Sequence, residues 1–141
     1  MATLIEGREL PATGETVSAI VLDSNVVIYL GTKREHTLRI ESPFKLLLGP
    51  AELEVVYGPY EVPRWPPSHL TELAALVTER VAHANAYTNG ELSFEFESEG
   101  VLTLAVRPDL EYEAWSYSYG GLLLHCPPGG DLGRATLHPQ P

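Results

Sequence analysis

The chain has 141 residues, of which 44% are hydrophobic and 20% charged, and its formal net charge is −10 at pH 7. These totals are typical of a single globular domain, and the acidic balance disfavours nucleic-acid binding because phosphate backbones repel negative charge. No apolar run approaches the roughly 20 residues of a membrane span, and a single Cys excludes an internal disulfide. With no signal-peptide pattern at the N-terminus, we expect a cytoplasmic protein.

The first third of the chain is predicted to form β-strands. An N-terminal arm, residues 1–14, leads into Val- and Ile-rich or alternating segments separated by turn formers, and we predict strands at 16–23, 25–31 and 36–42. Pro43 interrupts the pattern and predicts a bend before an apolar strand at 44–48. The connection at 49–67 contains five prolines, with a further short strand at 53–57.

Residues 68–84 have the periodicity of an amphipathic helix. Apolar residues recur at helical spacing along one stripe, at Leu70, Leu73, Val77, Val81 and Ala84. Ser68 is placed to cap the N-terminus of this helix. We therefore predict one helix over 68–84, with its apolar face against a sheet.

The second half of the chain again predicts strands. Asn89-Gly90 is a strong hairpin signal, and in the strand after it three apolar residues alternate with Ser93 and glutamates, at Leu92, Phe94 and Phe96. Further strands are predicted at 100–106, 112–119 and 122–126, and residues 134–141 are expected to form a frayed tail.

A weak internal repeat connects the two halves. Residues 17–40 and 81–104 share the order strand, turn, strand, turn, strand, with an offset of about 64 residues. Two such meanders and one helix give the predicted fold class, which is α+β: a mostly antiparallel sheet of about seven or eight strands with one amphipathic helix.

Histidine and cysteine give little support for metal or catalytic chemistry. The five His, at 36, 69, 83, 125 and 138, include no pair at a metal-ligand spacing. Neighbouring strand residues such as His125 and Cys126 point to opposite faces. Cys126 follows three leucines and is interpreted as a core residue, although a nucleophile with a partner elsewhere in the chain is the open alternative. We predict no catalytic residues, no metal and no cofactor.

Carboxylates concentrate in one region. Between Glu91 and Glu113 there are seven acidic residues and one basic residue, Arg107. The two interpretations are a solvated outer face of a sheet and a docking surface for a cationic partner. The candidate docking residues are Glu91, Glu95, Glu97, Glu111 and Glu113.

Aromatic residues follow the carboxylates. On a strand through 112–119, the side chains of Trp115, Tyr117 and Tyr119 share one face. They are either part of the core or, if exposed beside the acids, anchors of a protein interface, where Trp and Tyr are enriched.

Several short motifs resemble those of a family of small bacterial proteins known only as a domain of unknown function. The motifs are Leu-Arg-Ile-Glu-x-Pro-Phe at 38–44, Tyr-Glu-x-Trp at 112–115 and Cys-x-Pro-Gly-Gly at 126–130, after a Gly-x-x-Val first strand at 14–17. The resemblance covers most of residues 10–133 and implies no catalytic residues. Members often end in an apolar-Trp strand after the Gly-Gly pair, but this chain has Leu-Gly-Arg-Ala at 132–135.

The sequence therefore favours a non-enzymatic, acidic protein-binding domain, of the kind represented by immunity-type inhibitors of basic bacterial toxins. One alternative is a small-ligand binder or enzyme with a pocket between the sheet, the helix and the 49–67 connection. The other is a structural homo-oligomer that pairs through an exposed strand. The expected partner is a protein, and the chain itself is expected to be a monomer or a homodimer.

Overall fold

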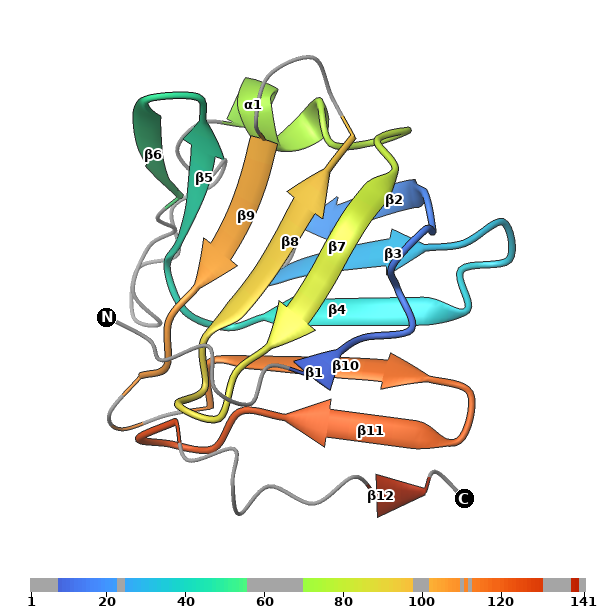
Figure 1. Ribbon diagram of the computed structural model, residues 1–141, viewed down its shortest axis with the longest axis vertical. Helices are drawn as coiled ribbons and strands as arrows, with labels where there is room; N and C mark the ends of the chain where they lie inside the picture. The colour runs from blue at the N-terminus through green and yellow to red at the C-terminus, as the bar shows by residue number, and fades with distance from the viewer. Residues whose placement is uncertain are drawn as a thin grey trace.

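A computed structural model describes residues 8–22, 25–55, 70–97, 102–109, 111, 113–130 and 138–139. These residues form two antiparallel sheets and one short helix, α1 (Leu70–Ala74). The strands of one sheet run across those of the other (Figure 1), and the side chains between the sheets form the core. The mostly antiparallel sheet is confirmed, but the described residues hold more strands and less helix than the predicted α+β fold.

Each sheet has five strands of at least four residues and a two-residue strand at one edge. Sheet I has the spatial order β1 (Arg8–Glu9), β7 (Val81–Ala86), β8 (Leu92–Phe96), β9 (Leu102–Val106), β5 (Phe44–Leu48) and β6 (Ala51–Val55). Sheet II has the order β12 (His138–Pro139), β11 (Leu122–His125), β10 (Trp115–Tyr119), β4 (His36–Ile40), β3 (Val26–Leu30) and β2 (Val17–Leu22).

The predicted helix over 68–84 is wrong for most of its length. Among the described residues the helix covers only Leu70–Ala74, and the chain then turns through Thr78, which has a positive φ of 80°. Residues from Val81 onward form β7, where a register shift follows Val81. The extra residue at this β-bulge puts Val81 and Ala84 on the same inward face, three residues apart, and this spacing imitates a helix.

The two halves of the chain, residues 10–55 and 74–126, repeat the same strand order. The meander β2–β3–β4 of sheet II corresponds to β7–β8–β9 of sheet I, and the hairpin β5–β6 of sheet I corresponds to β10–β11 of sheet II. Each half therefore contributes three strands to one sheet and two to the other. The predicted pair of meanders is confirmed.

Strand register also repeats between the halves. The bulge after Val17 in β2 matches the bulge after Val81 in β7, 64 residues later. Where β4 meets β10, Leu38 pairs with Tyr117, and at the equivalent contact Leu104 pairs with Leu46. The repeat is thus one of backbone pairing, although few of the paired residues are identical.

Backbone hydrogen bonds join the starts of β2 and β7 reciprocally. Val17 N donates to Glu79 O over 2.9 Å, and Val81 N donates to Glu15 O over 2.8 Å. Thr78 N donates to Val17 O over 2.9 Å, and its counterpart Gly14 N donates to Val81 O over 2.8 Å. These reciprocal bonds join the two halves where the first residues of β2 and β7 meet, and each half makes the same contacts with the other.

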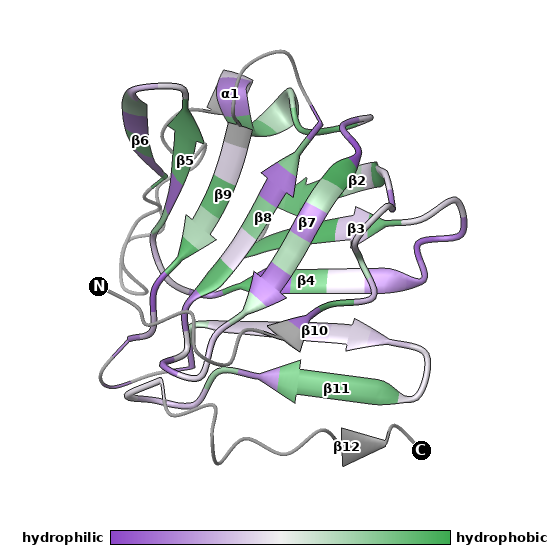
Figure 2. Cartoon of the chain, in the orientation of Figure 1, coloured by the Kyte–Doolittle hydropathy of each residue, from purple (hydrophilic) through white to green (hydrophobic). Residues whose placement is uncertain are grey.

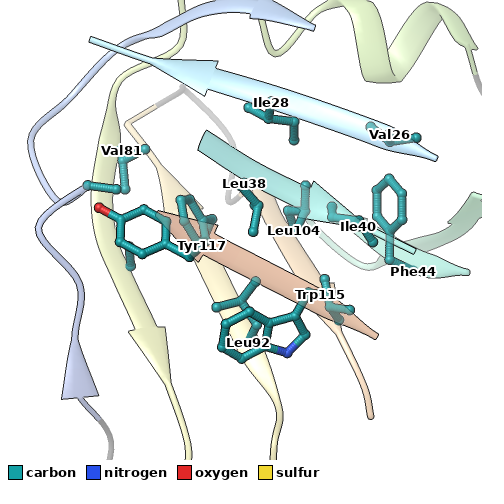
Figure 3. Close-up of a cluster of buried hydrophobic side chains, with 14 of the residues drawn as sticks. Val26, Ile28, Leu38, Ile40, Phe44, Val81, Leu92, Leu104, Trp115 and Tyr117 are labelled. Atoms are coloured by element: carbon teal, nitrogen blue, oxygen red, sulfur yellow. The ribbon is translucent and has the colours of Figure 1, made fainter. Parts of the chain in front are cut away.

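The core lies between the sheets and receives equivalent side chains from both halves (Figure 3). Trp115 occupies the position that Phe44 has in the other half, and both are buried. Leu10 and Ala12, within the predicted N-terminal arm, are buried in the same core, and β1 pairs with β7. The described part of the arm therefore packs into the fold.

Candidate functional site

The outer face of the β7–β8 hairpin carries some of the carboxylates predicted as a docking surface. Leu92, Phe94 and Phe96 are buried, whereas Glu95 is exposed and Glu91 is half-buried. Polar and apolar residues alternate along both strands in Figure 2, and the sequence predicted this alternation for β8. The turn is the predicted one, because Gly90 has a positive φ of 93° and Gly90 N donates to Tyr87 O over 2.8 Å.

Tyr87 lies among these carboxylates, and sequence analysis did not single it out. Its backbone N donates to Glu91 O over 2.9 Å, which places it across the hairpin from Glu91. The pKa of the Tyr87 hydroxyl is raised by burial, then by the negative charges of Glu95 and Glu91. The Asn89-Gly90 hairpin signal fixes this pairing, so the register of the turn could have identified Tyr87.

Glu91 and Glu95 form no ion pair with a described residue, whereas Glu52 and Glu97 of the same sheet do. Glu97 binds Arg80 at 3.4 Å, and Arg80 Nε also donates to Gly14 O over 3.0 Å. Glu52 on β6 pairs with Lys45 on β5 at 3.6 Å. We define Tyr87, Glu91 and Glu95 as the hairpin face.

The two remaining predicted carboxylates lie elsewhere. Glu111 is exposed in the loop between β9 and β10, where its backbone N donates to Asp109 Oδ1 over 2.8 Å. Glu113 lies beside β11 of sheet II, with its carboxylate 3.7 Å from His125 Nδ1. The structure therefore groups Glu91 and Glu95 but separates Glu113 from them.

The aromatic strand β10 faces the core. Trp115 and Tyr117 are 0% and 4% exposed, so neither can contact a partner in this conformation, whereas Tyr119 at the end of the strand is 38% exposed. Figure 3 shows the rings of Trp115 and Tyr117 among Leu38, Leu92 and Leu104. The core interpretation of these two residues is confirmed, and the docking role predicted for them is not carried forward.

A buried polar cluster surrounds His36 at the start of β4. His36 Nδ1 lies 2.7 Å from the Tyr117 hydroxyl, and its Nε2 lies 3.9 Å from Glu15 Oε1. The ring of Tyr119 stacks on the imidazole, with centroids 4.1 Å apart and an interplanar angle of 5°. Tyr119 and Glu15 thus separate His36 from solvent.

Burial favours the neutral form of His36 in this cluster. Burial lowers the pKa of His36, although the charges of Glu15 and Glu35 act in the opposite direction. Burial also raises the pKa of Tyr117, whose hydroxyl oxygen accepts a hydrogen bond from the Ala12 backbone. We assign the phenol proton to the bond with Nδ1, so neutral His36 carries its own proton on Nε2, towards Glu15.

Two motifs of the sequence resemblance, those of Trp115 and Cys126, meet at the tip of the β7–β8 hairpin. Trp115 Nε1 donates to Gly90 O over 2.9 Å, and Cys126 Sγ lies 3.5 Å from the same oxygen. A Cβ added to Gly130 would lie 2.3 Å from Asn89 O and 2.6 Å from Pro108 Cβ. The Cys-x-Pro-Gly-Gly turn therefore packs backbone to backbone against the hairpin tip.

Cys126 has the environment of a structural residue. It is 0% exposed, and burial raises the pKa of its thiol to about 11, so the thiol is protonated near neutral pH. Cys126 occupies the position equivalent to Val55 in the first half. Both observations favour the predicted core role over the nucleophile.

Metal-ligating residue types do not gather in the part of the chain that the structure describes. No group of three or more His, Cys, Asp or Glu side chains in these ranges is arranged to hold a metal ion. Within the same ranges no helix has the length and apolar character needed to cross a bilayer. The predicted pocket beside the 49–67 connection falls largely on residues 56–69, which lie outside the described ranges.

Comparison with known proteins identifies a family but no activity. A model of a family of unknown function, DUF6188, matches residues 8–135. The chain belongs to this family. No curated protein and no solved structure matches it significantly. The predicted resemblance to a family of unknown function is confirmed at this level, while its motifs and its bacterial source stay predictions.

Proposed function

We propose that this member of DUF6188 is a non-enzymatic protein-binding domain whose hairpin face binds a basic protein. The observation that carries the proposal is the grouping of Tyr87, Glu91 and Glu95 on the outer face of β7–β8, where neither carboxylate is neutralised by a described base. The backbone that carries this face is paired from His83 opposite Glu95 to Ala86 opposite Leu92, so the spacing of its residues is set before binding.

Two physical effects support a basic partner. Unpaired carboxylates on a chain of net charge −10 attract a cationic protein and increase its association rate. A half-buried Tyr then offers a rigid ring whose further burial contributes contact energy at low entropic cost. The neighbouring His83, directly across from Glu95, adds a polar rim to this face.

Charge reversal on the hairpin face tests this proposal. The wild-type chain, the Glu91→Lys/Glu95→Lys variant and a Glu52→Lys control are used to capture partners from cells of the source organism. Glu52 lies on β6 of the same sheet, where it pairs with Lys45. Its reversal changes the net charge by the same amount as one of the two hairpin substitutions but leaves the hairpin face unaltered. We expect a basic protein to be retained by the wild type and the control and lost by the double variant.

Association kinetics then distinguish attraction by the carboxylates of the hairpin face from attraction by the net charge of the whole chain. The double variant should associate at least about tenfold more slowly with the captured protein, with a weaker dependence on salt. Tyr87→Ala should instead increase the dissociation rate. Equal on-rates for the wild type and the double variant would remove the steering role.

An immunity-type inhibitor of a basic toxin is the narrower form of this proposal. In that case the captured protein is toxic when produced alone, and co-production of the wild-type chain restores growth. The double variant restores growth less well than the Glu52→Lys control. A captured partner that is harmless when produced alone rejects the immunity role but leaves the binding function in place.

A further inference from the structure

We infer that Asn89 is a site of spontaneous deamidation, and that local opening of the β7–β8 hairpin tip sets the rate of this modification. Asn89 is followed by Gly90, whose backbone nitrogen is unhindered because glycine has no Cβ. The other two asparagines of the chain, Asn25 and Asn85, are followed by the bulkier Val and Ala. Asn89 is exposed at the tip, so water reaches its side chain.

The reaction needs no reagent other than water. The backbone nitrogen of Gly90 attacks Cγ of Asn89, so a new C–N bond forms while the C–N bond of the side-chain amide breaks. The amide nitrogen leaves as ammonia and takes the proton that the Gly90 nitrogen loses, which closes a succinimide ring. Water then opens the ring at either carbonyl. One product is aspartate, and the other is isoaspartate, in which the main chain runs through the former side chain.

The folded hairpin restrains both reacting groups. Gly90 N donates to Tyr87 O over 2.8 Å, and this hydrogen bond must break before the nitrogen can attack. Asn89 Oδ1 accepts a hydrogen bond from Glu91 N over 3.0 Å, which restricts rotation of the side-chain amide. Attack by the Gly90 nitrogen therefore requires the tip to open first.

The turn after β11 packs against the peptide between Asn89 and Gly90 (Figure 1). Trp115 Nε1 donates to Gly90 O over 2.9 Å. A Cβ added to Gly130 would lie 2.3 Å from Asn89 O, and one added to Gly90 would lie 2.5 Å from Gly130 Cα. With so little space, this peptide cannot rotate into a ring without separating from Gly130. Local opening of such a contact limits reactions of the backbone groups that it covers.

The same contacts distinguish the two products. Aspartate leaves the length of the main chain unchanged, so the tip can close again with a carboxylate at position 89. Isoaspartate lengthens the main chain by a methylene carbon, at the point where Asn89 O and Gly90 O are already in contact with Gly130 and Trp115. Chains with aspartate therefore return to the native tip, whereas chains with isoaspartate lose these contacts.

Mass spectrometry of peptides from the full chain, incubated either folded or in denaturant, tests the control by folding. Asn89 should deamidate at least about tenfold more slowly in the folded chain than in denaturant. In denaturant it should also react faster than Asn25 and Asn85, which serve as internal controls. Equal rates for Asn89 in the two states overturn the inference, and so does an Asn89 that stays unmodified in denaturant.

Two variants distinguish opening of the tip from unfolding of the whole chain. Trp115→Phe introduces the residue found at the equivalent position 44 and removes the hydrogen bond to Gly90 O. Tyr117→Phe also removes one buried hydrogen bond, but that bond is to His36. Trp115→Phe should accelerate deamidation of Asn89 in the folded chain at least about fivefold, and Tyr117→Phe should leave it unchanged. Equal acceleration by both variants overturns the assignment to the tip.

Thermal unfolding of the products tests the contact with Gly130 without either variant. Asn89→Asp should have the same midpoint as the wild type, whereas the isoaspartate fraction purified after incubation should have a lower one. This comparison and that between folded and denatured wild type hold even if Trp115→Phe does not fold. An isoaspartate fraction as stable as the wild type overturns the inference that the tip must open.

Discussion

The two halves of the chain share one backbone plan but fill part of it differently. His36, Tyr117 and Tyr119 stand where the strand correspondence places Leu102, Leu46 and Leu48. These three positions form a hydrogen-bonded polar cluster, whereas the sequence of the other half has leucine at each corresponding position. Polar groups in a core are tolerated when each finds a partner, and here Glu15 and the Ala12 backbone, from the turn before β2, supply the additional partners.

The two halves share the backbone arrangement that defines the fold. The side chains that differ between equivalent positions give each half its own contacts. The polar cluster connects the segment Leu10–Glu15 to β4 and β10, and β1 continues this segment onto the edge of β7. The equivalent edge of β2 has no such cover among the described strands. The asymmetry therefore concerns both the core and the sheet edges.

The largest expected effect comes from the contact between the hairpin tip and the turn after β11. Trp115, unlike its counterpart Phe44, donates a hydrogen bond, and its acceptor Gly90 O lies in the backbone that Gly130 touches. Gly130→Ala would place Cβ 2.3 Å from Asn89 O, so we expect a loss of roughly 3 kcal/mol or more in unfolding free energy. Denaturant titration measures this loss.

Gly129→Ala is the control for that substitution. Gly129 has a similar φ of 82°, against 81° at Gly130, but nothing lies within 4 Å of an added Cβ. Only conformational strain applies there, and we expect a loss of about 1 kcal/mol. Equal losses at the two positions would show that the close backbone contact contributes nothing beyond the positive φ.

The next largest effect follows from making the polar cluster resemble its aliphatic counterpart. His36→Leu introduces the residue found at the equivalent position 102 and leaves the Tyr117 hydroxyl without its acceptor. We expect a loss of about 1–3 kcal/mol for this variant or for Tyr117→Phe alone. Because the two side chains share one hydrogen bond, the double variant should lose less than the sum of the singles, as a double-mutant cycle measures. An additive double variant would contradict the predicted coupling.

The pH dependence of the same variants checks the protonation state. The pKa of His36 is lowered below 6.5 in the folded protein, so the unfolded chain takes up this proton first as pH falls. Stability from neutral His36 is therefore present above about pH 6.5 and is lost as pH falls through the folded pKa. The difference in unfolding free energy between wild type and His36→Leu should shrink from pH 7 to pH 5. A constant difference would indicate an unshifted His36.

Sequence alone could predict the strands with clear alternation or turn signals. The segments around β4, β5 and β8 were recognisable because apolar residues recur at every second position in them and Pro43 or Asn89-Gly90 bounds them. The helix prediction failed because the bulge in β7 changes the phase of the inward residues, and no local composition signal reveals a bulge.

The candidate site was predictable only in part. The outward glutamates of β8 follow from alternation, and the alternation also placed Trp115, Tyr117 and Tyr119 on one face. Whether that face is buried or exposed depends on the position of the second sheet. Contacts between residues far apart in the sequence determine that position. The proximity of His36 to Tyr117, 81 residues later, has no local signal at all. The same holds for the cover of β7 by β1.

The smallest expected effect tests the turn that the two halves share. Gly14 and Thr78 occupy equivalent positions before β2 and β7, with φ values of 89° and 80°, and the backbone nitrogen of each donates to the other half. A β-branched residue is strained in this region, whereas Gly adopts it freely but loses more entropy on folding. Thr78→Gly should therefore stabilise the fold by only about 0.5–1 kcal/mol, and Gly14→Ala should destabilise it by about 1 kcal/mol. Thermal and chemical unfolding measure the change in unfolding free energy of each variant. If the two turns have the same structural role, the change is positive for Thr78→Gly and negative for Gly14→Ala. Destabilisation by Thr78→Gly would mean that the Thr78 side chain stabilises the second half in a way that its glycine counterpart does not.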